Sequence, residues 1–324
     1  MTTTLATKAS LVIAWLALSP SLALAQAWPS KPIRVIVPFA AGSFTDVLPR
    51  VVLDQAATQV KQPIVVENRG GAGGTIGTGA VAKAEPDGYT LLATSSAHTI
   101  TPTIYPNLPY DTARDLAGVA SLGLSPLVMI IAPSKGFKTV QEFVAAAKAK
   151  PGSINFASAG VGSATHLGAE RFIASAGFEA THIPYKGGPE ALTDVIAGRA
   201  DFYFCPLGTA LPQIRSGTVL ALAVSTPKRA TPLPDVPTTL ESGYVDSDYS
   251  FWVGVFAPSK TRRDVIGRVH DELQQSMAAP NVQKRLGELG VEPMPMTPEE
   301  FDALVQKEIV TSAALAKAAG LKPN

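Results

Sequence analysis

Hydrophobic positions along the chain follow two alternating patterns. Short runs rich in β-branched and aromatic residues, typical of buried strands, are separated by longer stretches with helical spacing. The expected strands cover residues 33–39, 63–67, 89–94, 127–132, 154–157, 181–184, 201–205, 219–224 and 251–257. The expected helices include residues 139–150, 163–176, 189–197, 262–279, 281–289 and 298–319. This alternation predicts an α/β protein with mainly parallel sheets flanked by helices.

A weak internal repeat divides the chain into two halves of similar design. The turn GSFTD starts at Gly42 and the turn GSATH starts at Gly162, and each follows an expected strand and opens an expected helix. In each half the next strand ends in a basic residue and two glycines, at residues 69–71 and 186–188. We therefore expect two βαβαβ lobes.

Two crossings between the lobes are expected. The first lies near residues 121–126, and the return runs through the Pro-rich stretch at 226–237. The predicted first domain is residues 28–124 plus 228–324, and the second is 125–227. A pair of crossings forms a hinge, around which the lobes close over a ligand like a Venus flytrap.

The N-terminus has the pattern of a secretory signal peptide. Lys8 precedes an apolar stretch at residues 11–24, and small residues around Ala25 offer a cleavage site. Pro20 interrupts the stretch, which argues against a membrane anchor because a spanning helix needs roughly 20 apolar residues. We expect residues 1–25 to be removed and the mature protein to be periplasmic.

The charge balance excludes one class of partner. Without residues 1–25 the chain has 26 basic and 26 acidic residues, so it lacks the basic footprint of a nucleic-acid-binding protein. Cys205 is the single cysteine, which excludes an internal disulfide. The histidines at 98, 166, 182 and 270 have no metal-ligand spacing, and we expect neither a metal nor a cofactor.

The two Gly-Ser turns have the chemistry of an anion site. A helix start leaves backbone N–H groups unpaired at the positive end of the helix dipole, and it therefore attracts an anion. Ser43, Thr45, Ser163 and Thr165 add hydroxyl groups. Two such turns facing each other would hold both ends of a small dianion. The alternative is that these hydroxyl groups are only helix caps.

Three further residues of the first turn leave alternatives open. Asp46 either complements the helix dipole or accepts a hydrogen bond from a ligand. Phe44 either closes the turn by a hydrophobic contact or forms an aromatic wall against an apolar ligand. Pro49 would disturb a helix that begins near Thr45, so we expect the helix to start later.

Catalysis and nucleotide binding have little support. The glycines of residues 65–80 lack the dinucleotide spacing and follow the second strand. Neither Ser43 nor Ser163 has a G-x-S-x-G setting, and His166 lies too close in sequence to Ser163 to act as its positioned base. His166 and Glu170 have the spacing of a surface pair. We predict that the protein is not an enzyme, with an exported serine hydrolase as the alternative.

Sequence blocks in order across nearly the whole mature chain resemble one family. They include WPSKPIRVIVPFAAGSFTDVLPR, QPIVVENRGGAGGTIGTGAVAKAEPDGYTLL, LPYDTARDLAGVA, AKPGSINFASAGVGSATHLGAE, HIPYKGGPEALTDVIAGRADF, LALAVSTPKRATPLPDVPTTLESGY and FWVGVFAP. The chain resembles the Bug-type solute-binding receptors of tripartite tricarboxylate transporters.

The resemblance implies a periplasmic, two-lobe binding protein fold of type II. It also implies capture of a small organic carboxylate and its delivery to a permease of one large and one small subunit. By resemblance, a carboxylate is held by residues 42–46, by residues 160–166, and by the stretch TSSAHT after the third strand. These implied positions include Gly42, Ser95, Ser96, His98, Gly162 and His166. A ligand-sensing subunit of a signalling receptor is a further alternative.

Three residues depart from the family pattern. Ser43 and Pro49 stand where relatives have a second glycine and a small residue. Cys205 occupies a position where relatives often have an acid, so an amino-acid ligand is disfavoured; it fits either the ligand site or the core. We expect a plain carboxylate, either a dicarboxylate or an aromatic acid, bound by a monomer.

Overall fold

The computed structural model describes residues 28–318. The chain divides into a short N-terminal unit, residues 1–30, and one compact unit from Lys31 onward. All the helices and strands below belong to the second unit. The predicted signal peptide, residues 1–25, lies outside the described residues.

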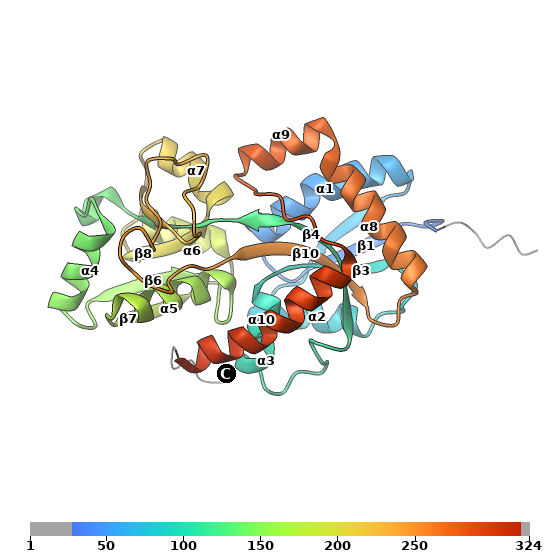
Figure 1. Cartoon of the computed structure of the whole chain (residues 1–324), viewed down its shortest axis with the longest axis horizontal. Coiled ribbons are helices and arrows are strands. Elements are labelled where there is room, and N and C mark those ends of the chain that lie inside the picture. The colour runs from blue at the N-terminus through green and yellow to red at the C-terminus, as the bar shows by residue number, and fades with distance from the viewer. Residues whose placement is uncertain (1–27, 319–324) are drawn as a thin grey trace, which may run out of the picture. The chain divides into compact units, whose positions relative to one another are not determined.

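Strands and helices alternate along the second unit (Figure 1). The strands are β1 (Ile33–Val37), β2 (Ile64–Asn68), β3 (Thr90–Ser95), β4 (Leu116–Ser125), β5 (Leu127–Ile131), β6 (Ile154–Ser158), β7 (Ala180–Pro184), β8 (Phe202–Pro206), β9 (Leu220–Val224) and β10 (Phe251–Pro258). The α-helices are α1 (Phe44–Val60), α2 (Thr75–Ala82), α3 (Ala97–Ile104), α4 (Val140–Ala149), α5 (Ala164–Ala176), α6 (Gly188–Ile196), α7 (Leu207–Arg215), α8 (Arg263–Ala278), α9 (Pro280–Glu288) and α10 (Pro298–Ala318). Short 3₁₀ turns lie at η1 (Ala72–Gly74) and η2 (Pro133–Lys135).

The strands form two mixed sheets, with orders β2-β1-β3-β10-β4 and β7-β6-β8-β5-β9. The two-lobe α/β architecture with mainly parallel sheets is confirmed, although one strand of each sheet runs against the others. β10 runs antiparallel to β3 and β4, and β5 runs antiparallel to β8 and β9. The two reversed strands are the ones that carry the crossings: β5 brings the chain from β4 into the second sheet through Pro126, and β10 brings it back into the first sheet.

Helices cover both faces of the first sheet. Figure 1 shows α1, α8 and α9 on one face and α2, α3 and α10 on the other. Phe301 of α10 is fully buried against Trp252 and Phe256 of β10. A Cβ atom at Gly254 would lie 2.3 Å from the ring of Phe301, so only glycine lets α10 approach this strand. In the second lobe, Phe143 of α4 and Phe172 of α5 pack with Phe156, Phe202 and Phe204 on one face of the sheet. The helices α6 and α7 pack on the other face, with Tyr203 and Cys205.

Several elements differ from expectation. The strand β4 and the helices α3 and α7 were not expected, and α1 begins at Phe44 although Pro49 lies inside it. The chain passes between the sheets at Pro126 and returns between Val224 and Phe251. The exact domain boundaries, at 124/125 and 227/228, stay a prediction.

Candidate functional site

The first Gly-Ser turn links β1 to α1. Gly42 has φ +76°, a left-handed conformation that favours glycine, and Ser43 is the extended N-cap residue. The hydroxyl of Ser43 makes no cap bond, and within residues 28–318 this buried oxygen has no hydrogen-bond partner. The cap interpretation of Ser43 is therefore wrong, because an N-cap side chain would accept a bond from the first turn.

Asp46 stabilises this turn by accepting three hydrogen bonds. Its carboxylate accepts hydrogen bonds from the Gly42 N–H (2.9 Å), Arg50 Nε (2.8 Å) and Asn68 Nδ2 (2.9 Å). Asn68 also donates to the carbonyl of Phe39, at 3.1 Å. The side chain of Asp46 is buried, and its oxygens are occupied by these donors. Asp46 thus fixes the shape of the turn rather than offering free acceptors to a ligand.

The second Gly-Ser turn, before α5, repeats this construction. Gly162 also has φ +76°, and its N–H donates to His166 Nδ1 at 3.2 Å, just as the Gly42 N–H donates to Asp46 four residues later. Here the serine is a true cap, since Ser163 Oγ accepts from the His166 N–H at 3.3 Å. Thr165 Oγ1 accepts from the Ala159 N–H at 2.9 Å and lies 3.1 Å from Ser163 Oγ. The internal repeat therefore extends to one hydrogen bond, from the glycine N–H to the side chain four residues later.

A stack of rings supports the second turn. The rings of His166 and His182 are 3.9 Å apart and nearly parallel, and Phe156 stacks on both. His166 is only 3% exposed, so the surface-pair interpretation of His166 and Glu170 was wrong, although their side chains do lie 3.4 Å apart. These histidines support the turn from within the lobe.

Ser158 and His182 form the closest arrangement to a hydrolase pair, with Oγ and Nε2 2.6 Å apart. Ser158 is fully buried, and its oxygen also accepts from the Gly160 N–H. Burial, together with the charge of neighbouring His166, lowers the pKa of His182 to about 3. An imidazole with this pKa is a weak base, and a buried hydroxyl cannot reach a substrate. The pair therefore shapes the turn at residues 158–160.

The two turns meet at one cavity between the sheets. Its volume is about 30 Å³, far below the roughly 300–1,000 Å³ of ligand sites, so a ligand needs the lobes to separate. It is lined by Phe39, Ser43, Phe44, Thr45, Ser95, Ala159, Ser163, Ala164, Thr165, Gly188, Pro189, Tyr203, Pro206, Thr209 and Phe251. None of these is an acid, lysine, arginine or histidine. Burial raises the pKa of Tyr203 well above its ordinary value, so it presents a neutral hydroxyl.

A wider chamber of about 510 Å³ lies beside this cavity and shares Phe39 and Ala159 with it. Both glycine-rich stretches of the repeat reach it, through Gly70 to Gly74 and through Lys186. Tyr105 of the first lobe donates to the carbonyl of Val161 across this chamber, at 3.3 Å. Both lobes therefore line this chamber.

The structure sorts the predicted site residues into two groups. Those that line the inner cavity are Ser43, Phe44, Thr45, Ser95, Ser163 and Thr165. Those that lie outside its lining are Gly42, Asp46, Ser96, His98, Gly162, His166 and Cys205. Ser96 lies 3.5 Å from the hydroxyl of Tyr249, His98 packs on Phe256, and Cys205 is buried in the core of the second lobe, where burial raises its pKa.

Sequence reasoning missed several residues that line the inner cavity. Pro206 ends β8 and Tyr203 lies near its start, Ala159 directly follows β6, Phe39 lies two residues after the end of β1, and Phe251 begins β10. The signal for Phe39, Ala159 and Pro206 is their place at the carboxyl ends of parallel strands, beyond which ligands of α/β proteins bind. No such signal points to Tyr203 or Phe251.

Residues 28–318 have neither a metal-binding cluster nor a membrane-spanning helix. Among them, no cluster of three or more histidine, cysteine, aspartate or glutamate side chains is placed to hold a metal ion. No helix in the same range is long and apolar enough to cross a membrane.

One family model and several solved structures match this chain. The family model described as "Tripartite tricarboxylate transporter family receptor" matches residues 48–321. The periplasmic binding protein BugD is similar in structure, with a TM-score of 0.86 and 34% identity, covering 92% of this chain and all of that one. A Rhodopseudomonas palustris protein solved with adipate has a TM-score of 0.88 and 29% identity, covering 92% of this chain and 100% of that one. MatC from the same species, with bound malate, has a TM-score of 0.84 and 30% identity over 89% and 99% of the two chains.

Proposed function

Because this chain belongs to the tripartite tricarboxylate transporter receptor family, we propose that it captures a small organic carboxylate between its lobes and delivers it to the membrane permease of such a transporter. The family is one of solute-binding receptors, and its member BugD is a periplasmic binding protein. Export to the periplasm, capture and delivery are successive steps of one role.

One observation carries the proposal: the starts of α1 and α5 line the same uncharged cavity. Each start presents backbone N–H groups and a positive dipole end, which favour an anion without a cationic side chain. The hydroxyl groups of Ser43, Ser163 and Thr165 add donors around it. A carboxylate fits this arrangement because its two oxygens accept several such bonds at once.

The body of the ligand meets an apolar wall. The rings of Phe44 and Phe251 lie 5.6 Å apart, and Phe39 and Pro206 complete this side of the cavity. An aromatic acid or the methylene chain of a dicarboxylate would pack here. Relatives bound to adipate and to malate support the dicarboxylate. Lys186 lines the outer chamber and would face a second carboxylate that extends outward.

A carboxylate ligand is expected to raise the stability of the protein. At 100 times the dissociation constant it adds about 2.7 kcal/mol to the free energy of unfolding. Thermal unfolding is measured with adipate, malate, citrate and benzoate, and with adipamide as the uncharged match of adipate. Adipamide should give no shift. Melting temperatures that stay constant with every carboxylate would contradict the proposal.

Replacing Ser43 and Ser163 is expected to separate binding from folding. Ser43→Ala should weaken binding by about 0.5–1.5 kcal/mol and leave stability unchanged, because its hydroxyl has no partner in the described chain. Ser163→Ala should weaken binding similarly and also lower stability by about 1 kcal/mol, because it removes the cap of α5. Calorimetric titration and urea unfolding measure the two effects. Unchanged affinity in both variants would place the carboxylate elsewhere.

A further inference from the structure

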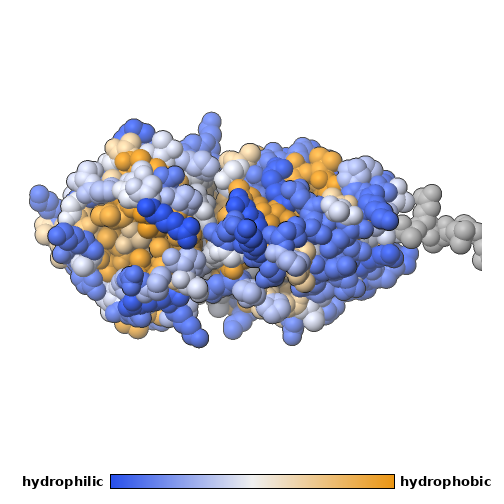
Figure 2. Space-filling view, turned by 90° about the horizontal axis from the view of Figure 1, so that it is seen from above, coloured by the Kyte–Doolittle hydropathy of each residue, from blue (hydrophilic) through white to orange (hydrophobic). Residues whose placement is uncertain are grey.

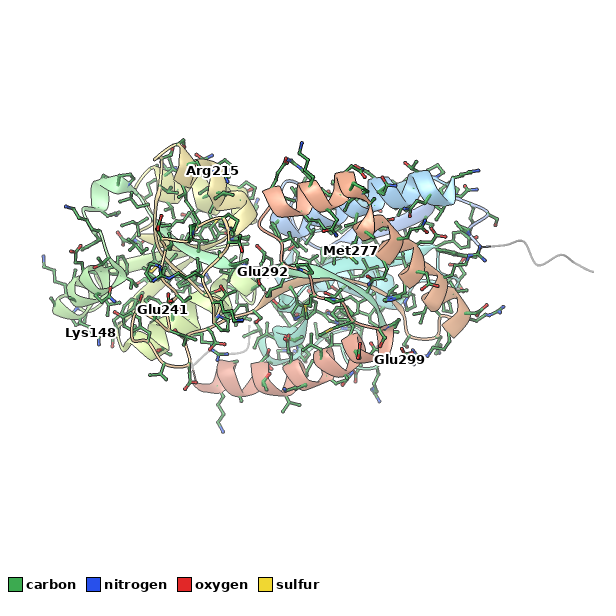
Figure 3. All side chains as sticks on the ribbon, turned by 45° about the horizontal axis from the view of Figure 1, so that its top comes forward. Lys148, Arg215, Glu241, Met277, Glu292 and Glu299 are labelled. Atoms are coloured by element: carbon green, nitrogen blue, oxygen red, sulfur yellow. The ribbon has the colours of Figure 1, made fainter. Side chains whose placement is uncertain are left out.

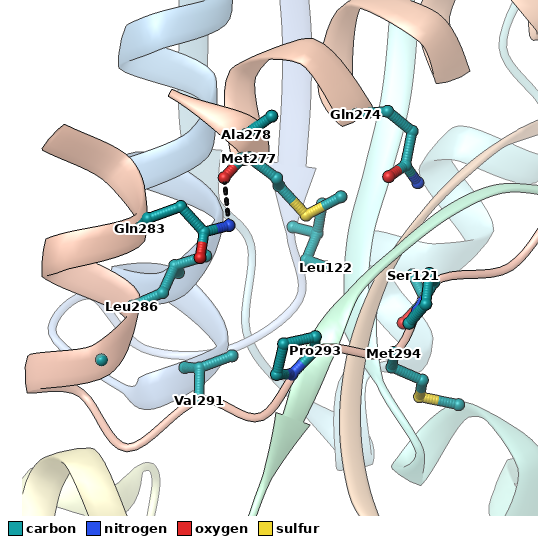
Figure 4. A pocket seen from close by; sticks show the side chains of 12 residues that line it. Ser121, Leu122, Gln274, Met277, Ala278, Gln283, Leu286, Val291, Pro293 and Met294 are labelled. Atoms are coloured by element: carbon teal, nitrogen blue, oxygen red, sulfur yellow. Dashed lines mark hydrogen bonds between the residues drawn. The ribbon is translucent and has the colours of Figure 1, made fainter. Parts of the chain in front are cut away.

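A second cavity lies within the first lobe and shares no lining residue with the cavity between the lobes. It has a volume of about 310 Å³, opens to solvent and is bordered by α8, α9, the strand β4 and residues 291–295 (Figure 4). Its lining is Ser121, Leu122, Gln274, Met277, Ala278, Gln283, Leu286, Gly287, Val291, Pro293, Met294 and Pro295. Figure 3 shows Met277 on α8 and Glu292 beside β4, on either side of this region.

The floor of this cavity is a β-bulge. Where β4 pairs with β10, Leu122 is the extra residue, and the bulge brings the consecutive residues Ser121 and Leu122 into the lining. The next residue, Gly123, has φ +136°, and a Cβ atom there would lie 2.5 Å from Val291. Backbone hydrogen bonds of 2.9 and 2.8 Å then join Leu124 to Glu292. The bulge and the 291–295 segment thus hold each other in place around the cavity.

The polar groups of the cavity are uncharged, and one is unsatisfied. Ser121 is 1% exposed, and within residues 28–318 its hydroxyl has no hydrogen-bond partner. Burying such a group is unfavourable unless something bonds to it. Figure 4 places Ser121 beside Met294, on the opposite side of the cavity from Gln283. Gln283 donates to the carbonyl of Met277 at 2.6 Å, and Gln274 points toward the open space.

We propose that this cavity binds a small uncharged molecule with an apolar body and one hydrogen-bonding group, which pairs with Ser121. No acid, lysine, arginine or histidine lines the cavity, so a charged ligand would lose its hydration without gaining a partner. The side chains of Met277 and Met294 adapt to apolar shapes. The volume matches the lower end of small-molecule sites. Figure 2, seen from the α9 side, shows hydrophobic patches on this face among hydrophilic residues.

Methionine methyl groups give a direct test. The described chain has methionines at 129, 277, 294 and 296, so a ¹³C-methyl-methionine NMR spectrum is simple. Met277 and Met294 line the cavity, whereas Met129 lies in the core of the second lobe and reports on folding. Benzyl alcohol is the probe, and benzoate is its charged match. Benzyl alcohol should shift the Met277 and Met294 signals saturably and leave Met129 unchanged, and benzoate should not shift these two signals.

Two variants locate the probe. Ser121→Ala should weaken binding of benzyl alcohol about 2- to 12-fold, the loss of one neutral hydrogen bond. Gly287→Phe should abolish it, because Gly287 lines the cavity and an added Cβ atom there meets no atom within 4 Å, which leaves room for the ring to occupy the cavity. Gly267→Phe is the matched control: it also has open space, lies on α8 and is outside the lining.

Three results would overturn the proposal. The first is the absence of a saturable shift of Met277 and Met294, as expected if the cavity holds water only. The second is an equal shift in Gly287→Phe with Met129 unchanged. The third is equally strong binding of benzoate at these two methionines. None of these results concerns the carboxylate cavity, so the proposed function is tested separately.

Discussion

Lowering the pH from 7 to 4 is expected to cost the protein about 3 kcal/mol of its free energy of unfolding through His98 alone. His98 is 3% exposed, and its ring centroid lies 5.0 Å from that of Phe256. Its Nε2 atom has no hydrogen-bond partner within residues 28–318. Burial lowers its pKa to about 4, although a hydrogen bond to the Thr112 backbone partly opposes this shift. Between pH 6.5 and 4 the unfolded chain therefore takes up a proton that the native state refuses, and stability falls.

Other groups act in the same window. His182, with its pKa lowered to about 3, contributes in the same direction down to a lower pH. Asp302 and Glu308 oppose this trend at the acidic end, because burial raises their pKa and the native state then binds protons more readily. The net slope of stability against pH thus combines several groups, and His98 must be isolated by substitution.

The substitution His98→Leu isolates the contribution of His98 to the pH dependence of the free energy of unfolding. Leucine keeps an apolar side chain in the core and takes up no proton. Urea unfolding of both proteins at pH 7, 6, 5 and 4 should give curves that converge as the pH falls, with the wild type losing about 3 kcal/mol more than the variant. Parallel curves would show that the pKa of His98 is the same in the native and the unfolded state.

The sequence predicts individual strands better than contacts between elements that are distant in the chain. The runs of apolar residues locate most strands within one or two residues, because burial selects them directly. The strand β4 was missed because its sequence, LAGVASLGLS, is rich in small residues and glycine. Its glycines are required by tertiary contacts: a Cβ atom at Gly118 would lie 2.9 Å from Phe301, which is nearly 200 residues away. No local pattern carries that information.

In the candidate site, too, the sequence predicts local features but not the contacts between them. Both Gly-Ser-x-Thr turns open a helix as expected, although α1 begins at Phe44 and not later, and the structure places Ser43, Thr45, Ser163 and Thr165 in one cavity lining. The equivalent roles of Asp46 and His166, which end the two turns, were not predictable, since nothing in the chemistry of a carboxylate and an imidazole marks them as equivalent. Only the hydrogen bonds show the equivalence: the Gly42 N–H donates to Asp46 and the Gly162 N–H donates to His166, so that both side chains fix the conformation of their turn.

Replacing Asp46 should have a larger effect than replacing any residue that lines the cavity. Asp46→Ala leaves the Gly42 N–H, Asn68 and Arg50 without their shared acceptor. We expect the free energy of unfolding to fall by about 3 kcal/mol, the lower end of the range for breaking a buried ion pair. The lower end applies because the side chain of Arg50 is 41% exposed and can return to water.

The same substitution should weaken carboxylate binding more than tenfold, because the released turn no longer aims the start of α1 at the cavity. Asp54→Ala, at an exposed position of the same helix, is the matched control and should change neither quantity. Asp46→Asn should lie between the two, since an amide oxygen still accepts one bond but cannot pair with Arg50. Urea unfolding and calorimetric titration are measured on all three variants. Full affinity in a destabilised Asp46→Ala would show that the turn keeps its shape without this anchor, and that the carboxylate is held mainly by the second lobe.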